Sequence, residues 1–357
     1  MQVQVSVNEK EQESIDIECK CTQHYQKTNV EQSYSIRSSY TAADSIPFKL
    51  ISDARIVGII TQRKVIPPWH VQFIPTNKCN LNCPFCSCAE DDRKTEMNIT
   101  DAEYIISLLH ELGSRAVTIT GGGEPFLYKH ISRLIWGFVL HNIQVGLVTN
   151  GLLLNRNHSA LKPVTWCRIS NGDDRQFTDD YHRTLSEVVA SNQHIDWAFS
   201  HVVSRHPNIC EIKKVIGFAN EHKFTHVRLV ADLLDYENVD MEALQYQLED
   251  DKIDLSRVIF QARNEPVRGM PCYICYLKPI IGADCKVYTC CGVQYALKKP
   301  SKKMPRELCL GSAFDMQKII ERSHRPFDGS ICHRCYYKSY NDVLRELLAE
   351  HEHEVWV

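Results

Sequence analysis

The feature that most constrains this chain is a group of three cysteines in the spacing C-x3-C-x2-C. Cys79, Cys83 and Cys86 lie in a short loop directly after the strand-like run 70–74. A loop this tight can place three thiolates on one face of a small inorganic core, but a fourth ligand must come from elsewhere. Soft thiolates select zinc, Cu(I) or iron–sulfur clusters, and a 4Fe–4S cube takes one protein ligand per iron. The spacing therefore predicts either a cluster with one open iron, where chemistry can occur, or half of a zinc site.

Apolar runs and amphipathic segments alternate regularly after Pro67 and Pro68. The expected strands cover residues 70–75, 116–120, 143–149, 165–170, 196–203 and 226–231. The expected helices cover residues 100–112, 130–141, 178–192, 209–222 and 240–250. A capping box formed by Thr100 and Glu103 is expected to begin the first helix. Strands separated by such helices indicate βαβ units and a parallel sheet, so the sequence predicts an α/β fold with its ligand site at the carboxyl ends of the strands.

Glycine-rich or polar turns follow consecutive predicted strands. The second strand ends in T-G-G-G-E-P, residues 120–125, where three glycines would let a ligand approach bare backbone. A phosphate-binding turn is the alternative, but no Lys or Ser/Thr follows as in a P-loop, and Glu124 would repel phosphate and suit a cationic amine. The third and fourth strands end in T-N-G, residues 149–151, and R-I-S-N-G-D-D, residues 168–174. Together with the cysteine loop, these turns predict one ligand site at one edge of the sheet.

The order of these motifs resembles that of the radical S-adenosylmethionine (SAM) superfamily. In that superfamily an aromatic residue, here Phe85, precedes the last cysteine, and the open iron of the cluster chelates SAM. The resemblance implies a partial (β/α)6 barrel whose 4Fe–4S cluster is held by Cys79, Cys83 and Cys86. This chain has one extra glycine before the family's G-G-E-P motif. The residues that the resemblance places near SAM are Gly121, Gly122, Gly123, Glu124, Pro125, Asn150, Ser170, Asn171 and Asp173.

Eight of the sixteen cysteines lie between residues 272 and 335. Residues 279–291 are predicted to form a β-hairpin with its turn at 284–285, which holds one cysteine at a strand end. The loop before the hairpin offers Cys272 or Cys275, and a C-x2-C pair follows near the end of the chain. The predicted four-thiolate site combines one of these two cysteines with Cys290, Cys332 and Cys335.

This cysteine-rich segment resembles the auxiliary-cluster domain of many radical SAM enzymes, in its short "twitch" form rather than the longer "SPASM" form. The resemblance implies a small domain made of a hairpin and a helix, with a second 4Fe–4S cluster. The spacing from Cys272 to Cys290 is closer to the family's pattern than that from Cys275, so the ligands that the resemblance implies are Cys272, Cys290, Cys332 and Cys335. The family often has Asp-Gly in the hairpin turn, where this chain has Asp284 and Cys285. The alternative is a four-cysteine zinc ribbon that only stabilises the segment.

These patterns divide the chain into five segments. Residues 1–45 are polar with weak periodicity, and the apolar run 48–66 predicts a short strand pair. The expected segments are an N-terminal extension with that strand pair (1–66), the barrel (67–250), a linker (251–270), the auxiliary-cluster domain (271–341), and a C-terminal helix and tail (342–357).

Composition excludes several classes of protein. A net charge of -3 gives no basic footprint for non-specific nucleic-acid binding. No apolar run approaches the ~20 residues of a membrane span, and the N-terminus lacks the basic and apolar regions of a signal peptide. Sixteen cysteines in 357 residues fall below the roughly 8–10% of a disulfide scaffold. Clustered cysteines without a secretion signal predict metal or redox work and a cytoplasmic location.

The resemblance implies an enzyme that cleaves SAM reductively to methionine and a 5′-deoxyadenosyl radical, which then abstracts a hydrogen atom from a substrate. An auxiliary cluster would accept an electron from the substrate radical, which suits a net oxidation, and an electron donor such as flavodoxin or ferredoxin would supply the first electron. Residues 1–66 lack the helical periodicity of a leader-peptide-binding module. A small-molecule substrate such as a sugar, aminocyclitol or nucleotide is therefore expected. The alternatives are a peptide- or protein-modifying maturase, a SAM enzyme with a structural zinc tail, and a non-catalytic zinc-stapled protein.

Overall fold

A ten-stranded sheet organises the part of the chain that the computed structural model describes, which is residues 46–262, 271–299, 302–335 and 337–350. These residues belong to the compact unit 36–357. The strand order is β11-β10-β9-β1-β2-β3-β4-β5-β6-β7, and the neighbours from β9 to β7 are parallel. The strands of the central run are β1 (His70–Phe73), β2 (Ala116–Ile119), β3 (Gln144–Thr149), β4 (Val164–Gly172), β5 (Asp196–Val203), β6 (His226–Ala231) and β7 (Val258–Gln261).

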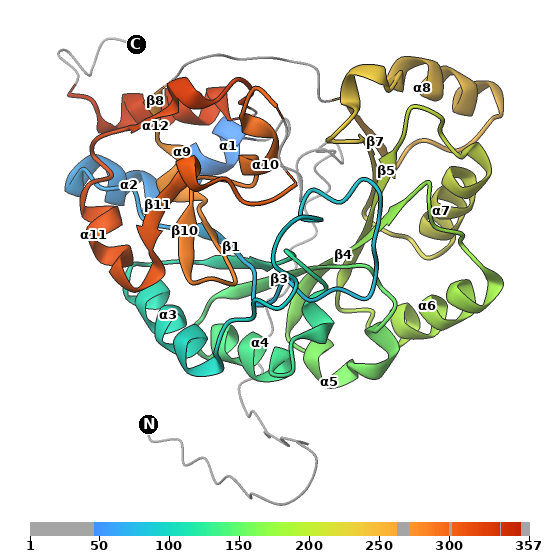
Figure 1. Cartoon of the computed structure of the whole chain (residues 1–357), viewed down its shortest axis with the longest axis horizontal. Coiled ribbons are helices and arrows are strands. Elements are labelled where there is room, and N and C mark those ends of the chain that lie inside the picture. Colours follow the sequence, from blue (N-terminus) through green and yellow to red (C-terminus); the bar gives the residue numbers. More distant parts are fainter. Residues whose placement is uncertain (1–45, 263–270, 300–301, 336, 351–357) are drawn as a thin grey trace, which may run out of the picture. The chain divides into compact units, whose positions relative to one another are not determined.

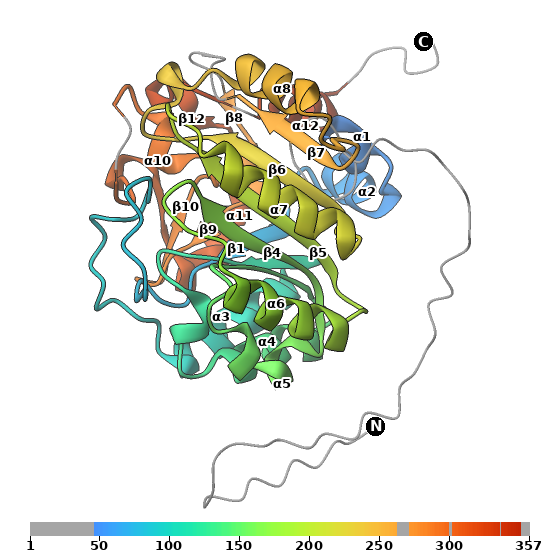
Figure 2. The same cartoon turned by 90° about the vertical axis from the view of Figure 1, so that its right-hand side faces the viewer.

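A helix follows each of the strands β1 to β6, which gives six β/α units and confirms the predicted alternation. The helices lie along the outside of the curved sheet (Figure 1), and α6 and α7 cover neighbouring strands (Figure 2). They are α3 (Ile99–Glu111), α4 (Ile131–Leu140), α5 (His158–Leu161), α6 (Asp179–Ser191), α7 (Ile209–Glu221) and α8 (Met241–Asp250). Each predicted strand and helix of the barrel is present, with ends that differ by a few residues at most.

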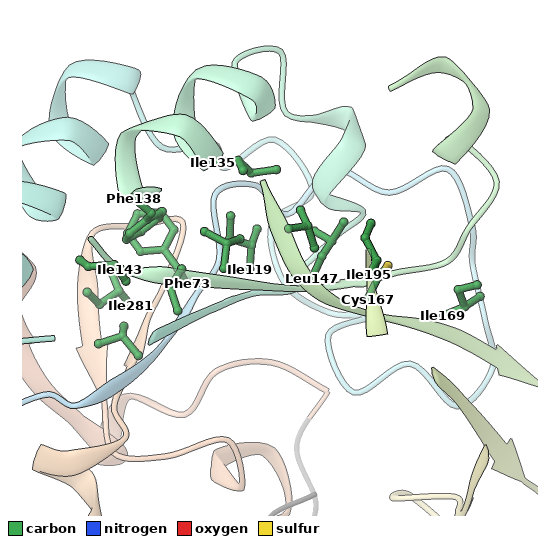
Figure 3. Packing of buried hydrophobic residues seen from close by; sticks show 14 of the residues in the cluster. Phe73, Ile119, Ile135, Phe138, Ile143, Leu147, Cys167, Ile169, Ile195 and Ile281 are labelled. Carbon is green, nitrogen blue, oxygen red and sulfur yellow. The ribbon is translucent and has the colours of Figure 1, made fainter. Parts of the chain in front are cut away.

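The core lies between the sheet and these helices, because alternate strand residues point towards them. Phe73, Ile119 and Leu147 are fully buried on the side of the sheet that faces Ile135 and Phe138 of α4 (Figure 3). The rings of Phe73 and Phe138 meet edge to face, with centroids 5.3 Å apart. The intervening strand residues occupy the opposite side, which we call the interior face.

The cysteine-rich segment extends this same sheet. The predicted hairpin is confirmed: β9 (Ile280–Ile281) pairs antiparallel with β10 (Lys286–Tyr288), and Cys285 in the turn adopts a left-handed φ of 58°. On its other side β9 pairs in parallel with β1, and Gln72 N donates to Pro279 O at 2.9 Å. Strand β11 (Cys309–Ser312) pairs with β10, so the hairpin is continuous with the barrel sheet. The sequence did not predict this continuity.

The prediction of a short strand pair at residues 48–66 was wrong. The segment forms two helices, α1 (Ile46–Ile51) and α2 (Ala54–Arg63). Asp53 caps α2 by accepting from Arg55 N at 3.1 Å. Ile56 and Ile60 lie one turn apart and are fully buried, which is helical periodicity in an otherwise apolar run. Both helices pack with the C-terminal helix α12 (Lys338–Leu348), which begins before the expected boundary at residue 342.

Two further details of the prediction were corrected. Strand β7 lies inside the range 251–270 that was expected to be a linker. It was not predicted because four residues after an acidic turn give too short a pattern to recognise. Helix α3 is capped by Asn98, whose side chain accepts from Thr100 N at 2.9 Å, so the predicted capping box does not form. Glu103 instead pairs with Arg133. The predicted extension at residues 1–45 lies outside the described residues. None of the described helices is both long and apolar enough to cross a membrane.

Candidate functional site

The loop Thr76–Cys88, which we call the cysteine loop, leaves the carboxyl end of β1 and is held at its base. Thr76 forms an isolated bridge with Glu96, and Lys78 Nζ lies 3.1 Å from a carboxylate oxygen of Glu96. The three cysteines of the C-x3-C-x2-C motif, Cys79, Cys83 and Cys86, are partly exposed free thiols. Cys86 N donates to Cys83 O at 3.1 Å, which forms a tight turn between the last two cysteines. The loop therefore offers three thiols to one edge of the sheet.

The glycine-rich turn after β2 packs directly against the cysteine loop. Gly123 N donates to Thr76 O at 3.0 Å, and Glu124 N donates to Lys78 O at 2.7 Å. A Cβ atom at Gly123 would lie 1.9 Å from Lys78 O, and one at Gly122 would lie 1.9 Å from Asn77 Oδ1. The glycines are thus required first for this close approach of two loops, and two of the backbone N–H groups are already used.

Glu124 connects the ends of β2 and β3. Its buried carboxylate accepts from Thr149 Oγ1 and from Asn150 N, both at 2.7 Å, and from Phe126 N at 3.1 Å. Burial raises the pKa of Glu124 although these hydrogen bonds oppose the change. Because both oxygens have internal partners, Glu124 fixes the turn in place. Pro125 begins a short 3-10 helix, Pro125–Leu127.

The ends of β3 and β4 also contact the cysteine loop. Asn150 Nδ2 donates to Asn80 Oδ1 at 2.7 Å. A Cβ atom at Gly172 would lie 2.3 Å from the ring of Phe85, so this aromatic residue packs flush on the backbone of β4. The structure therefore brings together the cysteine loop and the three turns that the sequence singled out.

Arg175 joins the same group and was not predicted. Its guanidinium donates to Asn150 O at 2.8 Å and to Ser170 O at 2.9 Å, which ties the ends of β3 and β4 together. Burial raises the pKa of Cys83, and Arg175 partly offsets this rise through charge and a hydrogen bond. The one sequence signal was its position just after the R-I-S-N-G-D-D turn.

Asn171 and Asp173 have different environments within that turn. The Asp173 carboxylate accepts from His201 Nε2 at 2.9 Å and from Ser204 N at 2.7 Å. Burial raises the pKa of Asp173, but these hydrogen bonds outweigh it and hold the value below its ordinary range. Asn171 is fully buried, and within the described residues neither its amide nitrogen nor its amide oxygen has a hydrogen-bond partner. Such an amide is costly unless a ligand or water satisfies it.

A cleft of about 690 Å³ opens beside the cysteine loop at the carboxyl ends of β4, β5 and β6. This volume falls within the range of about 300–1,000 Å³ that is typical of small-molecule sites. The wall combines an aromatic ring with carboxylates and backbone from three strand ends. The lining includes Phe85, Asp173, Asp174, Ser204, Asn208 and Asp232.

The four cysteines predicted as a second site line a common cavity. They come from β8 (Pro271–Cys272), the end of the hairpin, and the turn after the 3-10 helix Gly329–Ile331. Cys275 is fully buried on α9 (Ile274–Leu277), does not line the cavity, and donates its thiol to Cys272 O at 3.4 Å. This arrangement favours Cys272 over Cys275 as a ligand of the second site. The cysteines that line the cavity are Cys272, Cys290, Cys332 and Cys335.

Both cysteine sets fit iron–sulfur chemistry through their donors. Soft thiolate ligands, three at one site and four at the other, are those that 4Fe–4S clusters use. Burial raises the pKa of Cys332 to about 12, so metal binding there has to displace a proton. Among the described residues, no three His, Cys, Asp or Glu side chains lie close enough together to hold a metal ion.

The first site lies within a segment that matches a known family model. Residues 73–171 match the family model described as "Radical SAM superfamily". The match runs from the last residue of β1 into the end of β4. It therefore contains the cysteine loop, the glycine-rich turn and the ends of β3 and β4.

Several curated proteins are similar over this region. A GTP 3′,8-cyclase of Corynebacterium glutamicum (strain R) is 35% identical over 133 residues, which cover 32% of this chain and 35% of the relative. An uncharacterized protein of Archaeoglobus fulgidus is 30% identical, with 45% of this chain and 37% of the relative covered. A GTP 3′,8-cyclase of Staphylococcus saprophyticus is 30% identical, with 40% and 46% covered. The chain thus spans less than half the length of these relatives.

Two solved structures share the fold at low identity. SuiB of Streptococcus suis bound to S-adenosylmethionine has a TM-score of 0.51 and 17% identity, with 75% of this chain and 69% of that chain covered. The protein anSMEcpe, with bound AdoMet and the Kp18Cys peptide, has a TM-score of 0.50 and 15% identity, with 79% and 97% covered. Both similarities extend beyond the family-model match into the rest of the chain.

Proposed function

We propose, from the match of residues 73–171 to the radical SAM superfamily model, that the chain cleaves SAM reductively and abstracts a hydrogen atom from a small-molecule substrate. The outcome we propose is a net oxidation, in which an auxiliary 4Fe–4S cluster accepts an electron from the substrate radical. Flavodoxin or ferredoxin is the proposed class of electron donor.

The observation that carries this proposal is the meeting of the cysteine loop with three consecutive strand ends. Cys79, Cys83 and Cys86 would hold the cluster, which when bound supplies the electron that cleaves SAM. The backbone of Gly121–Pro125 lies against the same loop. Asn171 has buried amide atoms without partners and is the side chain most suited to meet a bound molecule. We assign Glu124 and Asp173 to positioning, because their carboxylates are occupied by internal hydrogen bonds.

The adjacent cleft supports a binding site for the adenosine part of SAM. It is lined by Phe85, which can pack against a flat ring, and by polar groups from the ends of β4 and β5. Asn150 and Ser170 lie at the ends of β3 and β4, which Arg175 ties together. These residues would exclude water from one side of the reacting groups and orient them, which is the protein's share of cofactor chemistry.

A small-molecule substrate is supported by the curated relatives, two of which are named for an activity on GTP. The covered region is about a third to a half of each relative, so this support concerns the class of substrate and not its identity. The second cluster is supported by the four thiols around one cavity. A link between this second cluster and the first site is supported by the sheet, because the hairpin that carries Cys290 pairs with β1.

Removal of the first cysteine set tests the proposal. The variant in which Cys79, Cys83 and Cys86 are replaced by Ala should form no 5′-deoxyadenosine from SAM under reducing, anaerobic conditions. Cys309→Ala changes a cysteine outside both sets and serves as the matched control. Undiminished 5′-deoxyadenosine in the triple variant, or none in the reconstituted wild-type protein, would refute the proposal.

A further inference from the structure

A buried asparagine on α12 lies beside the second cysteine set. Helix α12 begins three residues after Cys335 and packs against α9, which begins two residues after Cys272 (Figure 1). Asn341, in the first turn of α12, is only 2% exposed and lines the same cavity as the four cysteines. A buried amide is costly unless its hydrogen-bonding groups have partners, so each contact of Asn341 needs an account.

The side-chain oxygen of Asn341 holds the backbone that follows Cys272. It accepts from Tyr273 N at 2.7 Å and from Ile274 N at 2.9 Å. These N–H groups stand at the start of α9, where a helix has no acceptors of its own to offer. Because a backbone N–H can only donate, the two contacts also identify which atom of the amide is the oxygen.

The amide nitrogen of Asn341 is directed at the other end of the cysteine set. Asn341 Nδ2 donates to Cys335 Sγ at 3.9 Å, and Tyr337 N donates to the same sulfur at 3.3 Å. At the end of the hairpin, Gly292 N donates to Cys290 Sγ at 3.4 Å. N–H groups directed at sulfur favour the thiolate over the thiol. Hydrogen bonds to sulfur are also among the factors that set the reduction potential of an iron–sulfur cluster.

The two ends of this amide act on parts of the chain that are distant in the sequence. Cys335 follows Cys272 by 63 residues (335 minus 272), so no local motif can fix one thiol relative to the other. The pairing of β8 with Phe327–Asp328 already ties Cys272 to the segment before Cys332. Asn341 supplies the corresponding connection to Cys335, because one side chain bonds beside the first cysteine and to the last.

We propose that Asn341 is a positioning residue of the second cysteine set, which holds the backbone beside Cys272 with its oxygen and the sulfur of Cys335 with its N–H group. This inference rests on the proposed function, because it names the side chain that prepares this part of the chain for the auxiliary cluster. With a cluster bound, an N–H group at a ligand sulfur stabilises the reduced form, which carries more negative charge. Removal of that N–H group therefore lowers the reduction potential.

The full chain in which Cys79, Cys83 and Cys86 are replaced by Ala is the background for the test, because only the second set can then hold a cluster. Asn341→Leu removes both hydrogen-bonding groups of the amide, whereas Asn341→Asp keeps the oxygen and removes the donor. After anaerobic reconstitution the background should hold about four irons, and Asn341→Leu less than about half of them. Asn341→Asp should keep most of the iron. The midpoint potential, measured by EPR-monitored redox titration, should be lower than that of the background in both variants.

Asn192→Leu is the matched control in the same background. Asn192 is also a buried asparagine, but it caps the end of α6 and donates to Val188 O at 2.8 Å. Its replacement should change neither the iron content nor the midpoint potential. Of the two variants at Asn341, one is neutral and one is charged, so a fall in potential common to both reports the lost donor and not an added charge.

Two results would overturn the inference. One is a midpoint potential in Asn341→Asp equal to that of the background, because a role confined to capping α9 needs only the oxygen that this variant keeps. The other is an undiminished iron content in folded Asn341→Leu. If Asn341→Leu does not fold, the potential of Asn341→Asp decides the question.

The same samples separate this inference from the proposed function. No iron in the background protein would refute the auxiliary cluster and the inference with it. Formation of 5′-deoxyadenosine by the wild type is measured in parallel. Its absence, with iron in the background protein and a lowered potential in Asn341→Asp, would count against the proposed SAM cleavage and for the role of Asn341.

Discussion

His226 is a buried histidine beside two arginines. Burial lowers its pKa from 6.5 to about 3, and Arg168 and Arg228 contribute to the change. The imidazole is therefore neutral in the folded protein at pH values where it would bind a proton in the unfolded chain. The unfolded state binds more protons between these two values, so this group makes stability fall as the pH drops below 6.5.

Replacement of this histidine should flatten that pH dependence. Between pH 6.5 and pH 5 the wild-type protein should lose about 2 kcal/mol more of its free energy of unfolding than His226→Gln, from about 1.4 kcal/mol per pH unit. Denaturant unfolding at a series of pH values measures the difference in slope. His158→Gln, at an exposed position, is the control and should follow the wild type. Parallel pH profiles for the wild type and His226→Gln would contradict the expectation.

Among individual residues, the sequence identified those whose motif partners lie only a few positions away in the chain. Cys79, Cys83 and Cys86 and the glycines of the turn were recognisable because each motif lies within a few residues. Arg175 was missed because its partners are set by the register between strands, which one sequence does not reveal. The hydrogen bonds of Glu124 could not be predicted for the same reason, since its donors belong to the end of β3 and to its own turn.

The contact between the cysteine loop and the glycine-rich turn depends on the absence of a side chain at one position. A methyl group at Gly123 would meet the backbone carbonyl of Lys78, which is fixed by its bond to Glu124 N. A methyl group at Gly122 would meet the end of the Asn77 side chain, which can turn aside. Adding a side chain is therefore expected to lower stability more at Gly123 than at Gly122.

Gly123→Ala should separate the two loops, whereas Gly122→Ala should be tolerated better. We expect Gly123→Ala to lower the free energy of unfolding by about 1–3 kcal/mol, as for overpacked sites, and Gly122→Ala by less than half as much. SAM affinity, measured by equilibrium dialysis, should fall more in Gly123→Ala as well. Equal losses of stability and affinity in the two variants would show that the loop contact is not the limiting constraint.

The regular elements were predictable where periodicity was long and unambiguous. The barrel helices have polar and apolar faces over three turns or more, which fixes both their type and approximate ends. The prediction of a strand pair at residues 48–66 was wrong because a nearly continuous apolar run fits both the strand pattern and the helix pattern. Strand β7 was not predicted because four residues carry too little pattern. The pairing of β9 with β1 was not predicted because it joins segments that are distant in the sequence.

At the scale of the whole molecule, the first cysteine set and Cys290 of the second set are attached to the same ten-stranded sheet. The cysteine loop leaves β1, and Cys290 follows β10, which is separated from β1 only by β9. Cys272 lies on β8, which pairs with β12 (Phe327–Asp328) in a separate two-stranded sheet just before Cys332 and Cys335. The two sites are thus parts of one scaffold while keeping separate ligands.

Metal content should report the two sites independently. The reconstituted wild-type protein should hold about eight irons, and the Cys79, Cys83 and Cys86 triple Ala variant about four, by the stoichiometry of 4Fe–4S clusters. Elemental analysis of both proteins, with Cys309→Ala as control, measures this. A zinc site at the second set would instead give about four irons and one zinc in the wild type, with no iron in the triple variant. That result would remove the main support for a net oxidation.

The pairing of β9 with β1 also sets the order in which the chain can mature. Ile280 follows its partner Gln72 by 208 residues (280 minus 72), so during synthesis this edge of β1 remains unpaired until about four fifths of the 357 residues have been made. Such edges are open to pairing with other chains, and contacts between distant residues form slowly. The first cysteine set is therefore made long before the strand that finally covers β1, so on the nascent chain the cysteine loop leaves a strand whose second edge is still open.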